Sequence, residues 1–310
     1  MVDVLSELLA PMRLTGLYYS RWTVSAPWAV SGDADAMAVV HYVQAGSVYL
    51  ELSGAHTVIE AGDLAVFPHG DAHYLGDAPG RAATSLAELI PDRGIGGAGA
   101  VVIDGSGEPA VMLCAGLGYR RESEVGLYRS LPSMIILRSH DIAEVAMLSG
   151  ALDQLSSDWI RHEPGGYLIA LRAYELVFLL AIRSALRTAA SSRGDSAPRL
   201  WRALSDPGIG AALRAMHSDY DRPWTVATLA AEAGLSRSAF AARFRSSVGS
   251  APMRYLTEQR LRQAAVLLAE TRLSHDRIAR RVGYRSATGL HLAFKEVYGM
   301  APGHYRRAVR

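Results

Sequence analysis

Apolar positions in the C-terminal third of the chain follow one pattern twice, about fifty residues apart. In each copy a short helical pattern ends at a glycine, and a second helical pattern begins after a serine. Internal repeats fix an architecture, so this repeat predicts two copies of one supersecondary unit. The paired positions are Leu229 and Ile278, Ala230 and Ala279, Gly234 and Gly283, Ser236 and Ser286, Phe240 and Leu290, Phe244 and Phe294, Gly249 and Gly299, and Pro252 and Pro302.

The repeated unit is predicted to be a helix-turn-helix. Thr225 can cap the first helix, and Gly234 and Gly283 supply the left-handed turn conformation that other residues avoid. Ser236 and Ser286 are good N-cap residues for each second helix. This unit presents its second helix to the DNA major groove, so the free face of that helix is a candidate base reader.

Each second helix is also predicted to bury one stripe. The members are Phe240, Phe244 and Val248 in the first copy and Leu290, Phe294 and Val297 in the second. Between the copies, a helix is predicted from Pro252 to Glu270. At about 1.5 Å per residue it would be about 28 Å long, which can hold two recognition helices near one DNA turn apart, roughly 34 Å.

Residues before the repeat show a different pattern. Short apolar runs separated by glycines, at 39–43, 48–52, 56–59 and 64–67, predict the strands of a compact β-sandwich or barrel. Helical spacing follows at 142–155 and 167–186. The second of these segments has an apolar stripe that can pack on the barrel or form a symmetric dimer interface. Its members are Leu171, Phe178, Ile182 and Leu186.

The patterns together predict an α+β chain with two domains. We expect a barrel at 1–140, a helical packing or dimerisation segment at 141–187, and a small, polar linker at 188–200. An all-α domain follows at 201–310, with its two helix-turn-helix motifs joined by the long helix.

Charge separates the two halves of the chain. Residues 207–310 carry 17 Arg and Lys against 7 Asp and Glu, whereas residues 1–206 carry 15 against 23. The net charge of +2 for the whole chain hides this asymmetry. It predicts that the C-terminal half binds a polyanion.

Residues 201–307 resemble the two-motif DNA-binding domain of AraC-type transcription regulators. The matching stretches are ALSDP at 203–207, WTV at 224–226, GLSRSAF at 234–240, GYRS at 283–286 and AFK at 293–295. The resemblance implies two sets of DNA contacts. One set reads bases, and the other contacts phosphates and positions the protein without reading sequence. The base-facing positions would be Arg237, Ser238, Ala241 and Ala242 in the first copy and Arg285, Thr288 and His291 in the second; the phosphate contacts would be Arg243, Arg245, Lys295, Arg306 and Arg307.

The second copy departs from this family's pattern. Leu292 stands where the family usually has Arg, Leu290 replaces the usual Phe, and Gly289 lies inside the recognition helix. Glycine there costs about 1 kcal/mol of helix stability relative to Ala. Leucine cannot make the bidentate guanine contact of an arginine. We therefore expect the first copy to carry more of the specificity.

The N-terminal half resembles a cupin barrel. Gly62, Pro68, Gly70 and His73 have the spacing of the second cupin signature, and YVQAG at 42–46 resembles the end of the first. AraC-type regulators often carry such a barrel as the sensor. The two resemblances thus reinforce one another and imply a cupin-like sensor domain in which His73 points inward.

A metal site is expected to fail on its ligand count. Metal-binding cupins supply a His-x-His pair and a carboxylate before the final histidine, whereas this chain offers His41, His73 and the distant Asp33 and Asp35. That is a poor set for a transition metal, so we expect neither a metal nor another cofactor. The residues expected to orient a small molecule in a pocket are Trp22, His41, Tyr49 and His73; the alternative is that the histidines are satisfied by hydrogen bonds within the fold.

Cys114 is the only cysteine, so a disulfide framework within the chain is excluded and a reducing cytoplasm fits. It lies in an apolar run at 111–115, which favours a packed core cysteine over a redox-sensing thiol. We expect neither a secretion signal nor a membrane span, because no apolar segment is long enough.

The sequence therefore predicts a cytoplasmic, sequence-specific transcription regulator without catalytic residues, whose partners are double-stranded DNA and a small-molecule effector. By resemblance it would be a ligand-responsive activator that works with RNA polymerase as a homodimer, and we expect the stripe in 167–186 to form the dimer interface. Two alternatives remain. A cupin-type metalloenzyme tethered to DNA needs a full metal ligand set, and an architectural DNA binder would be insensitive to ligands.

Overall fold

The structure is a computed structural model that describes residue 6 and residues 14–35, 37–91, 96–119, 131–156, 164–191, 203–204 and 206–309. It forms two compact units, one made by residues 9–198 and the other mainly by residues 199–310. The predicted linker at 188–200 begins inside helix α7 (Gly166–Ser191), and its remainder lies outside the described residues.

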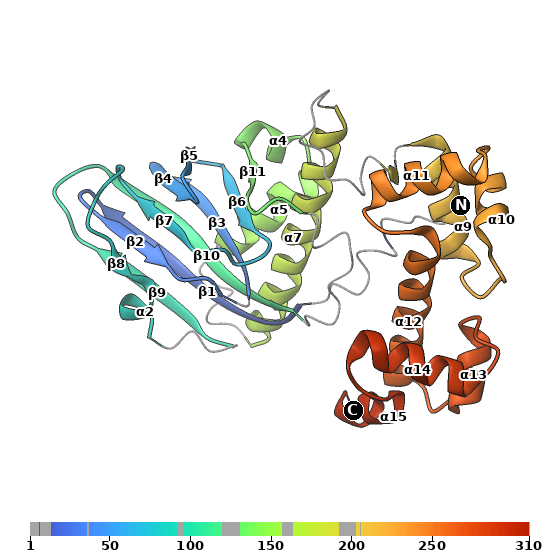
Figure 1. Ribbon diagram of the computed structural model, residues 1–310. Helices are drawn as coiled ribbons and strands as arrows, with labels where there is room; N and C mark the ends of the chain where they lie inside the picture. The colour runs from blue at the N-terminus through green and yellow to red at the C-terminus, as the bar shows by residue number, and fades with distance from the viewer. Residues whose placement is uncertain are drawn as a thin grey trace. The chain divides into compact units, whose positions relative to one another are not determined.

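Two sheets build the first unit (Figure 1). One has the strand order β11-β6-β3-β10-β1-β9 and the other β5-β4-β7-β2-β8. Pairing is antiparallel except between β1 and β9 and between β2 and β8. The strands are β1 (Leu14–Ser25), β2 (Ala29–Gly32), β3 (Ala38–Ala45), β4 (Ser47–Leu52), β5 (Ala55–Glu60), β6 (Leu64–Phe67), β7 (His73–Gly76), β8 (Thr84–Ser85), β9 (Ala98–Ile103), β10 (Pro109–Tyr119) and β11 (Ile135–Leu137).

Alternation along the strands explains why these sheets enclose a core. In β4, Val48, Leu50 and Leu52 are buried, whereas Tyr49 between them faces outward and is half-buried. This period of two gives β4 one apolar face, which the facing sheet covers. Trp22 and Phe67 are the largest fully buried side chains of the resulting core. The predicted β-barrel is confirmed.

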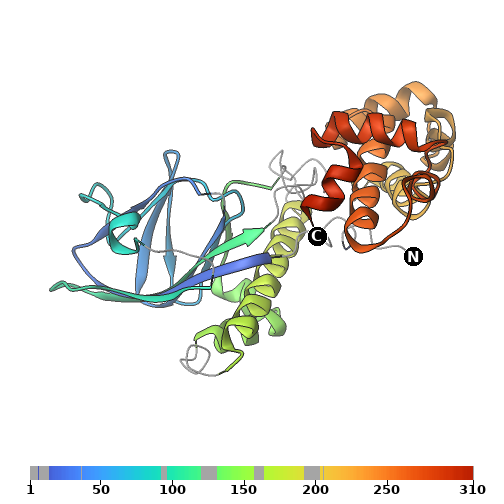
Figure 2. The ribbon, with the colours of Figure 1, turned by 90° about the horizontal axis from the view of Figure 1, so that it is seen from below.

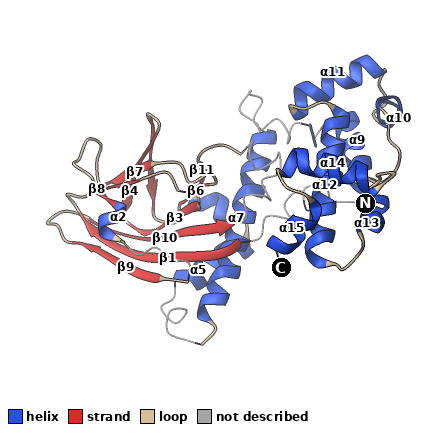
Figure 3. Ribbon diagram, turned by 60° about the horizontal axis from the view of Figure 1, so that its bottom comes forward, coloured by secondary structure: helices blue, strands red, loops and turns tan. Residues whose placement is uncertain are grey.

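Helices α4 (Ser139–Ala143), α5 (Ala146–Ser156) and α7 follow the sheets. Figures 2 and 3 show α5 and α7 side by side at one side of the barrel, with the short helix α2 (Leu86–Leu89) at the opposite side. Two side chains of α7 accept hydrogen bonds from backbone groups of β1. Tyr167 Oη accepts from Leu17 N, and Glu175 Oε1 from Leu14 N, each at 3.2 Å.

The apolar stripe of α7 corrects one expectation. Leu171, Phe178 and Ile182 are buried within their own unit, so a dimer interface built on this stripe is wrong. The reason is that α5 and β11 supply the apolar surface that the stripe needs, and a second copy is not required to cover it. Nothing is described for the side chain of Leu186.

The second unit is helical and is organised around α12 (Figure 1). The remaining helices are α9 (Pro207–Ser218), α10 (Val226–Glu232), α11 (Arg237–Val248), α13 (His275–Arg281), α14 (Ala287–Tyr298) and α15 (Pro302–Ala308). In the part of the chain that the structure describes, two helices (α9 and α11) pack at one end of α12 and three (α13, α14 and α15) at the other, and α12 has the predicted bounds Pro252–Glu270. Among the described residues, none of the helices combines the length and the apolar character needed to span a bilayer.

Both predicted helix-turn-helix motifs are present, α10–α11 and α13–α14. Ser236 Oγ accepts a hydrogen bond from Ala239 N at 3.3 Å, and Ser286 Oγ from Gly289 N at 3.1 Å, which caps each second helix. The turn glycines have positive φ, 65° at Gly234 and 80° at Gly283. These local signals were readable from the sequence, because each acts within four residues.

One member of the predicted stripes is wrong. Val297 is exposed, and Tyr298 takes its place by stacking on Phe294 with ring centroids 4.3 Å apart. A spacing of four from Phe294 reaches Tyr298, so the true stripe continues the interval of Leu290 and Phe294.

Candidate DNA interface and barrel cavity

The first recognition helix, α11, has one buried and one exposed face. Phe240 and Phe244 are buried and pack with tilted rings whose centroids lie 5.5 Å apart, which fixes the rotation of the helix. The opposite face is exposed and carries a positive charge near each end of the helix. Its sequence-predicted members are Arg237, Ser238, Ala242 and Arg245, with Ala241 half-buried at the edge.

Arg243 differs from the other basic residues of α11, because its charge is already paired. Its Nη2 lies 2.6 Å from Asp206 Oδ2, and Asp206 Oδ1 in turn caps α9 by accepting from Gly208 N and Ile209 N. The pair therefore ties the recognition helix to the N-terminus of α9. A phosphate would have to compete with this carboxylate for the guanidinium.

The second recognition helix, α14, exposes a less basic face. Thr288, His291, Leu292 and Lys295 are exposed, as is Arg285 just before the helix. Leu292 stands at the middle of this face and is 65% exposed. An exposed leucine there can contact a thymine methyl group but offers no hydrogen bond to a base edge.

Of the two arginines predicted in α15, only Arg307 is exposed. Arg306 is half-buried and donates from Nη2 to the carbonyl oxygen of Leu273 at 2.6 Å. Arg306 is therefore held by its own unit, while Arg307 remains available for a phosphate.

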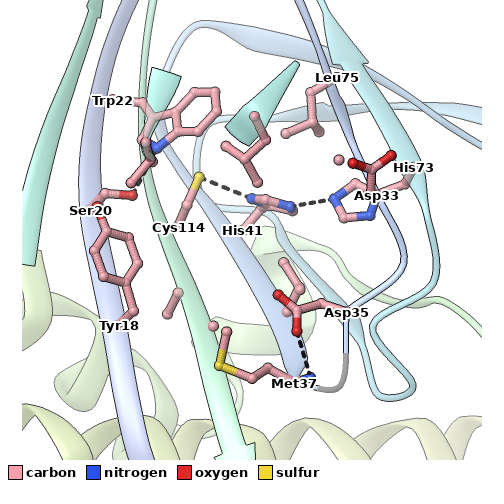
Figure 4. A pocket seen from close by; sticks show the side chains of 16 residues that line it. Tyr18, Ser20, Trp22, Asp33, Asp35, Met37, His41, His73, Leu75 and Cys114 are labelled. Carbon is pink, nitrogen blue, oxygen red and sulfur yellow. Dashed lines mark hydrogen bonds between the residues drawn. The ribbon is translucent and has the colours of Figure 1, made fainter. Parts of the chain in front are cut away.

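The first unit encloses a cavity between its two sheets (Figure 4). The centre of a water molecule can move through about 60 Å³ of it, room for about four to six waters. Its wall is mainly apolar, and Asp33, an exposed residue, marks where it reaches solvent. The apolar and aromatic lining includes Tyr18, Trp22, Met37, Val39, Leu75, Leu86 and Ile90.

Three of the four predicted pocket residues line this cavity: Trp22, His41 and His73. Tyr49 does not, because β4 turns it to the outer face, where it stacks on His56 with centroids 5.9 Å apart. Which face of β4 is inward depends on register, and a half-apolar tyrosine fits either face.

His41 and His73 meet Cys114 in a chain of short contacts across the cavity (Figure 4). Cys114 Sγ lies 2.9 Å from His41 Nδ1, and His41 Nε2 lies 2.9 Å from His73 Nε2. His73 Nδ1 lies 2.7 Å from the carbonyl oxygen of Asp71. Cys114 was predicted only as a core residue. Its pairing opposite His41 between β10 and β3 is a long-range register that local patterns do not reveal.

The Asp71 carbonyl fixes the direction of every hydrogen bond in this chain. A carbonyl oxygen can only accept, so His73 Nδ1–H donates to it and, in neutral His73, Nε2 accepts. His41 Nε2–H must then donate to His73, which leaves His41 Nδ1 to accept from the Cys114 thiol. All three side chains are thus satisfied in their neutral forms.

Burial favours those neutral forms. Desolvation and the nearby His73 hold the pKa of His41 well below its ordinary value of 6.5. Desolvation also lowers the pKa of His73, although its hydrogen bond to Asp71 partly opposes this. Burial raises the pKa of the Cys114 thiol well above its ordinary value.

The donor set does not fit the metal that many cupin barrels hold. His41 lies between Cys114 and His73 and contacts one with each ring nitrogen, so the three cannot converge on one ion. Among the described residues, no group of three or more His, Cys, Asp or Glu side chains is arranged to hold a metal. These three side chains therefore form a hydrogen-bonded polar cluster in an apolar cavity, not a metal site.

Comparison with known proteins covers both units. Residues 3–187 match the family described as Cupin, and residues 229–308 match that described as Helix-turn-helix domain. A putative AraC-like transcription regulator of Streptomyces lividans is 30% identical over 99% of this chain and 98% of its own length. The HTH-type transcriptional regulator AlkR of Acinetobacter baylyi is 28% identical over 99% of each chain. The solved DNA-binding domain of AdpA, in complex with a target DNA, is 40% identical over 34% of this chain and 94% of that domain, with a TM-score of 0.32.

Proposed function

Because the chain belongs to the AraC-type transcription regulators and binds DNA as they do, we propose that a small molecule in its barrel cavity controls DNA binding and activates transcription. The observation that carries the proposal is the joint presence of a ligand-sized apolar cavity in one unit and two exposed recognition helices in the other. Control requires that the effector binds two arrangements of the protein with different affinity.

The proposed division of labour follows the exposed side chains. Arg237 and Ser238 on α11 would read bases, while Arg245 and Arg307 would contact phosphates. In the second motif the base contacts would come from Arg285, Thr288 and His291, and the phosphate contact from Lys295. The proposal includes RNA polymerase as a partner and the cytoplasm as the compartment, where chromosomal DNA lies.

A homodimer is part of the proposal, with an interface other than the buried stripe of α7. Apolar side chains of α5 and α7 are exposed on the first unit, among them Met147, Leu168 and Ile169. Exposed apolar residues of this kind favour a symmetric contact. Sedimentation of the full-length protein tests this, with Leu168→Glu and Ile169→Glu expected to give monomers. A monomeric unsubstituted protein that still binds its operator as a single copy would refute it.

The experiment for the DNA-binding proposal is retention of fragmented genomic DNA by the full-length protein at about 150 mM salt, because phosphate contacts weaken steeply with salt. We expect a few sites with a shared motif. The double variant Arg237→Ala and Arg285→Ala should lose the motif, whereas Arg254→Ala, an exposed arginine of α12 paired with Glu258, should keep it.

Retention without a shared motif would favour the architectural alternative. The metalloenzyme alternative finds no support in the cavity, whose donors do not converge on one ion. Tight binding of iron or manganese by the full-length protein would revive it.

A further inference from the structure

Cys114 is the only cysteine of the chain, and it is placed as a nucleophile would be. Its side chain lines the cavity although the residue is only 5% exposed, so a molecule inside the cavity can touch a thiol that bulk solvent hardly reaches. His41 accepts the thiol hydrogen bond at 2.9 Å, which is the contact between nucleophile and base in cysteine-dependent catalysis.

The second histidine, His73, can accept part of the positive charge that proton transfer to His41 creates. When His41 Nδ1 takes the thiol proton, its Nε2–H is already donated to His73 Nε2 at 2.9 Å. His73 is in turn backed by the Asp71 carbonyl at 2.7 Å, which favours a positive charge on that ring. Burial opposes a standing thiolate, because it raises the pKa of Cys114 and lowers that of His41. His41 therefore takes the proton only as the sulfur–carbon bond forms, and the positive charge can then be shared by the two imidazoles.

We propose that Cys114 and His41 form a covalent capture site, and that the ligand is a small uncharged electrophile with a conjugated carbon–carbon double bond, such as an enone or a quinone. The inference rests on the proposed function, because it names the chemical class of the effector for the same cavity.

The proposed step balances without a further reactant. Cys114 Sγ forms a bond to the β-carbon as its proton passes to His41 Nδ1, and the π electrons of the double bond move onto the conjugated carbonyl as an enolate. His41 then returns the proton to the α-carbon. The net reaction adds S–H across C=C, and both histidines end neutral as they began.

The cavity wall selects this class of ligand. Its apolar and aromatic side chains favour an uncharged body, and among the lining residues the two charged ones are Asp33 and Asp35, which repel an acidic molecule. Capture by oxidation is disfavoured on separate grounds. The chain has no second cysteine to resolve a sulfenic acid as an intramolecular disulfide, whereas an adduct needs no second thiol.

The test measures alkylation of the full-length protein by N-ethylmaleimide at pH 7, followed by intact-protein mass spectrometry. Cys114 in the folded protein should react at least about tenfold faster than in the same protein unfolded in urea, since general-base assistance contributes that much or more. Iodoacetate, which is negatively charged, should react more slowly with the folded than with the unfolded protein. Cys114→Ser should give no adduct with either reagent.

Two variants test whether His41 is the base that takes the thiol proton. His41→Gln keeps a hydrogen-bond acceptor of similar reach but no base, and should lose the rate advantage over the unfolded chain. His56→Gln, at an exposed histidine of β5, is the matched control and should keep it. If the folded unsubstituted protein reacts more slowly than the unfolded chain, Cys114 is an inert core residue and the proposal is overturned, whether or not His41→Gln folds.

DNA binding separates this inference from the proposed function. The adduct-bearing and unmodified proteins are compared for affinity to the genomic sites retained above. A changed affinity supports capture as the regulatory signal. Rapid adduct formation with unchanged affinity would overturn the effector role of the electrophile while leaving sequence-specific DNA binding intact.

Discussion

Arg306 donates a hydrogen bond from Nη2 to the carbonyl oxygen of Leu273 at 2.6 Å, and so joins α15 to the segment that leads into α13. Its Nε is buried without a hydrogen-bond partner in the described structure. Arg307, the next residue, is exposed. Two adjacent arginines of one helix therefore differ in their surroundings, since Arg306 is held within the fold and Arg307 is exposed to solvent.

We expect Arg306→Ala to lower the free energy of unfolding of the helical unit by about 1–2 kcal/mol, because a charge-assisted hydrogen bond is lost. Arg307→Ala should leave stability within about 0.5 kcal/mol. It should instead weaken binding to all DNA sequences alike and reduce the slope of log affinity against log salt by about one unit. Urea unfolding and salt-dependent DNA binding of both variants check this. A reversed assignment of the two effects would contradict it.

The two recognition helices are expected to contribute unequally to sequence preference. Arg237→Ala should relax the preference at one operator position and cost about 1–3 kcal/mol of discrimination there. Leu292→Ala, at the centre of the exposed face of α14, should change the preference much less, because an apolar contact reads at most a methyl group.

Selection of binding sites from a random DNA library by the two variants measures this difference. Equal losses of preference would show that the second motif reads bases as strongly as the first, against the expectation from its sequence.

Elements set by local signals could be predicted from the sequence. Ser236 caps α11, Gly234 forms its turn, and α12 has the expected bounds, since each feature depends on residues within a few positions. Local sequence signals could not show whether the guanidinium of Arg243 is available for a phosphate. Its partner, Asp206, caps another helix, so the pair exists only in the folded unit.

The candidate cavity was predictable in part for the same reason. The cupin signature marks His73, but the position of Cys114 beside His41 depends on the register of β3 against β10. A shift of one residue along a strand would exchange its inward and outward faces. The placement of Tyr49 on the outer face follows from the register as well.

Gly283 and Gly234 allow a matched test of the two turns. Both have positive φ, so alanine at either position should lower the free energy of unfolding by about 1–2 kcal/mol. A Cβ at Gly283 would also lie 2.8 Å from the Asp221 carbonyl oxygen, whereas a Cβ at Gly234 meets nothing within 4 Å. Gly283→Ala should therefore cost at least about 1 kcal/mol more. Urea unfolding, followed by the fluorine NMR signal of 5-fluorotryptophan at Trp224, measures both. Equal losses of stability in the two variants would show that the segment at Asp221 moves away from the new Cβ at no energetic cost.

A buried polar network joins α9 to α12. His217 Nε2–H donates to Tyr255 Oη at 2.9 Å, and Gln259 Nε2 donates to His217 Nδ1 at 3.1 Å. Burial, with a smaller contribution from the charge of Arg262, lowers the pKa of His217 from 6.5 to about 3. In the pH range near 6.5, where His217 of the unfolded chain begins to take up a proton, His217 of the folded unit therefore stays neutral.

That difference in pKa predicts a loss of stability in acid. Between the unfolded value of 6.5 and the folded value of about 3, the unfolded chain binds a proton that the folded unit excludes. Stability from His217 is therefore complete above pH 6.5 and falls as pH decreases, by about 1.4 kcal/mol per unit, or roughly 2 kcal/mol between pH 6.5 and 5. In His217→Gln, which does not titrate, the decrease between pH 7 and 5 should be smaller by that amount, when unfolding is followed at Trp224. His304→Gln, at an exposed histidine of α15, is the control and should keep the decrease of the unsubstituted protein. The same pH dependence in His217→Gln and the unsubstituted protein would mean that water reaches His217 and that its pKa is not lowered.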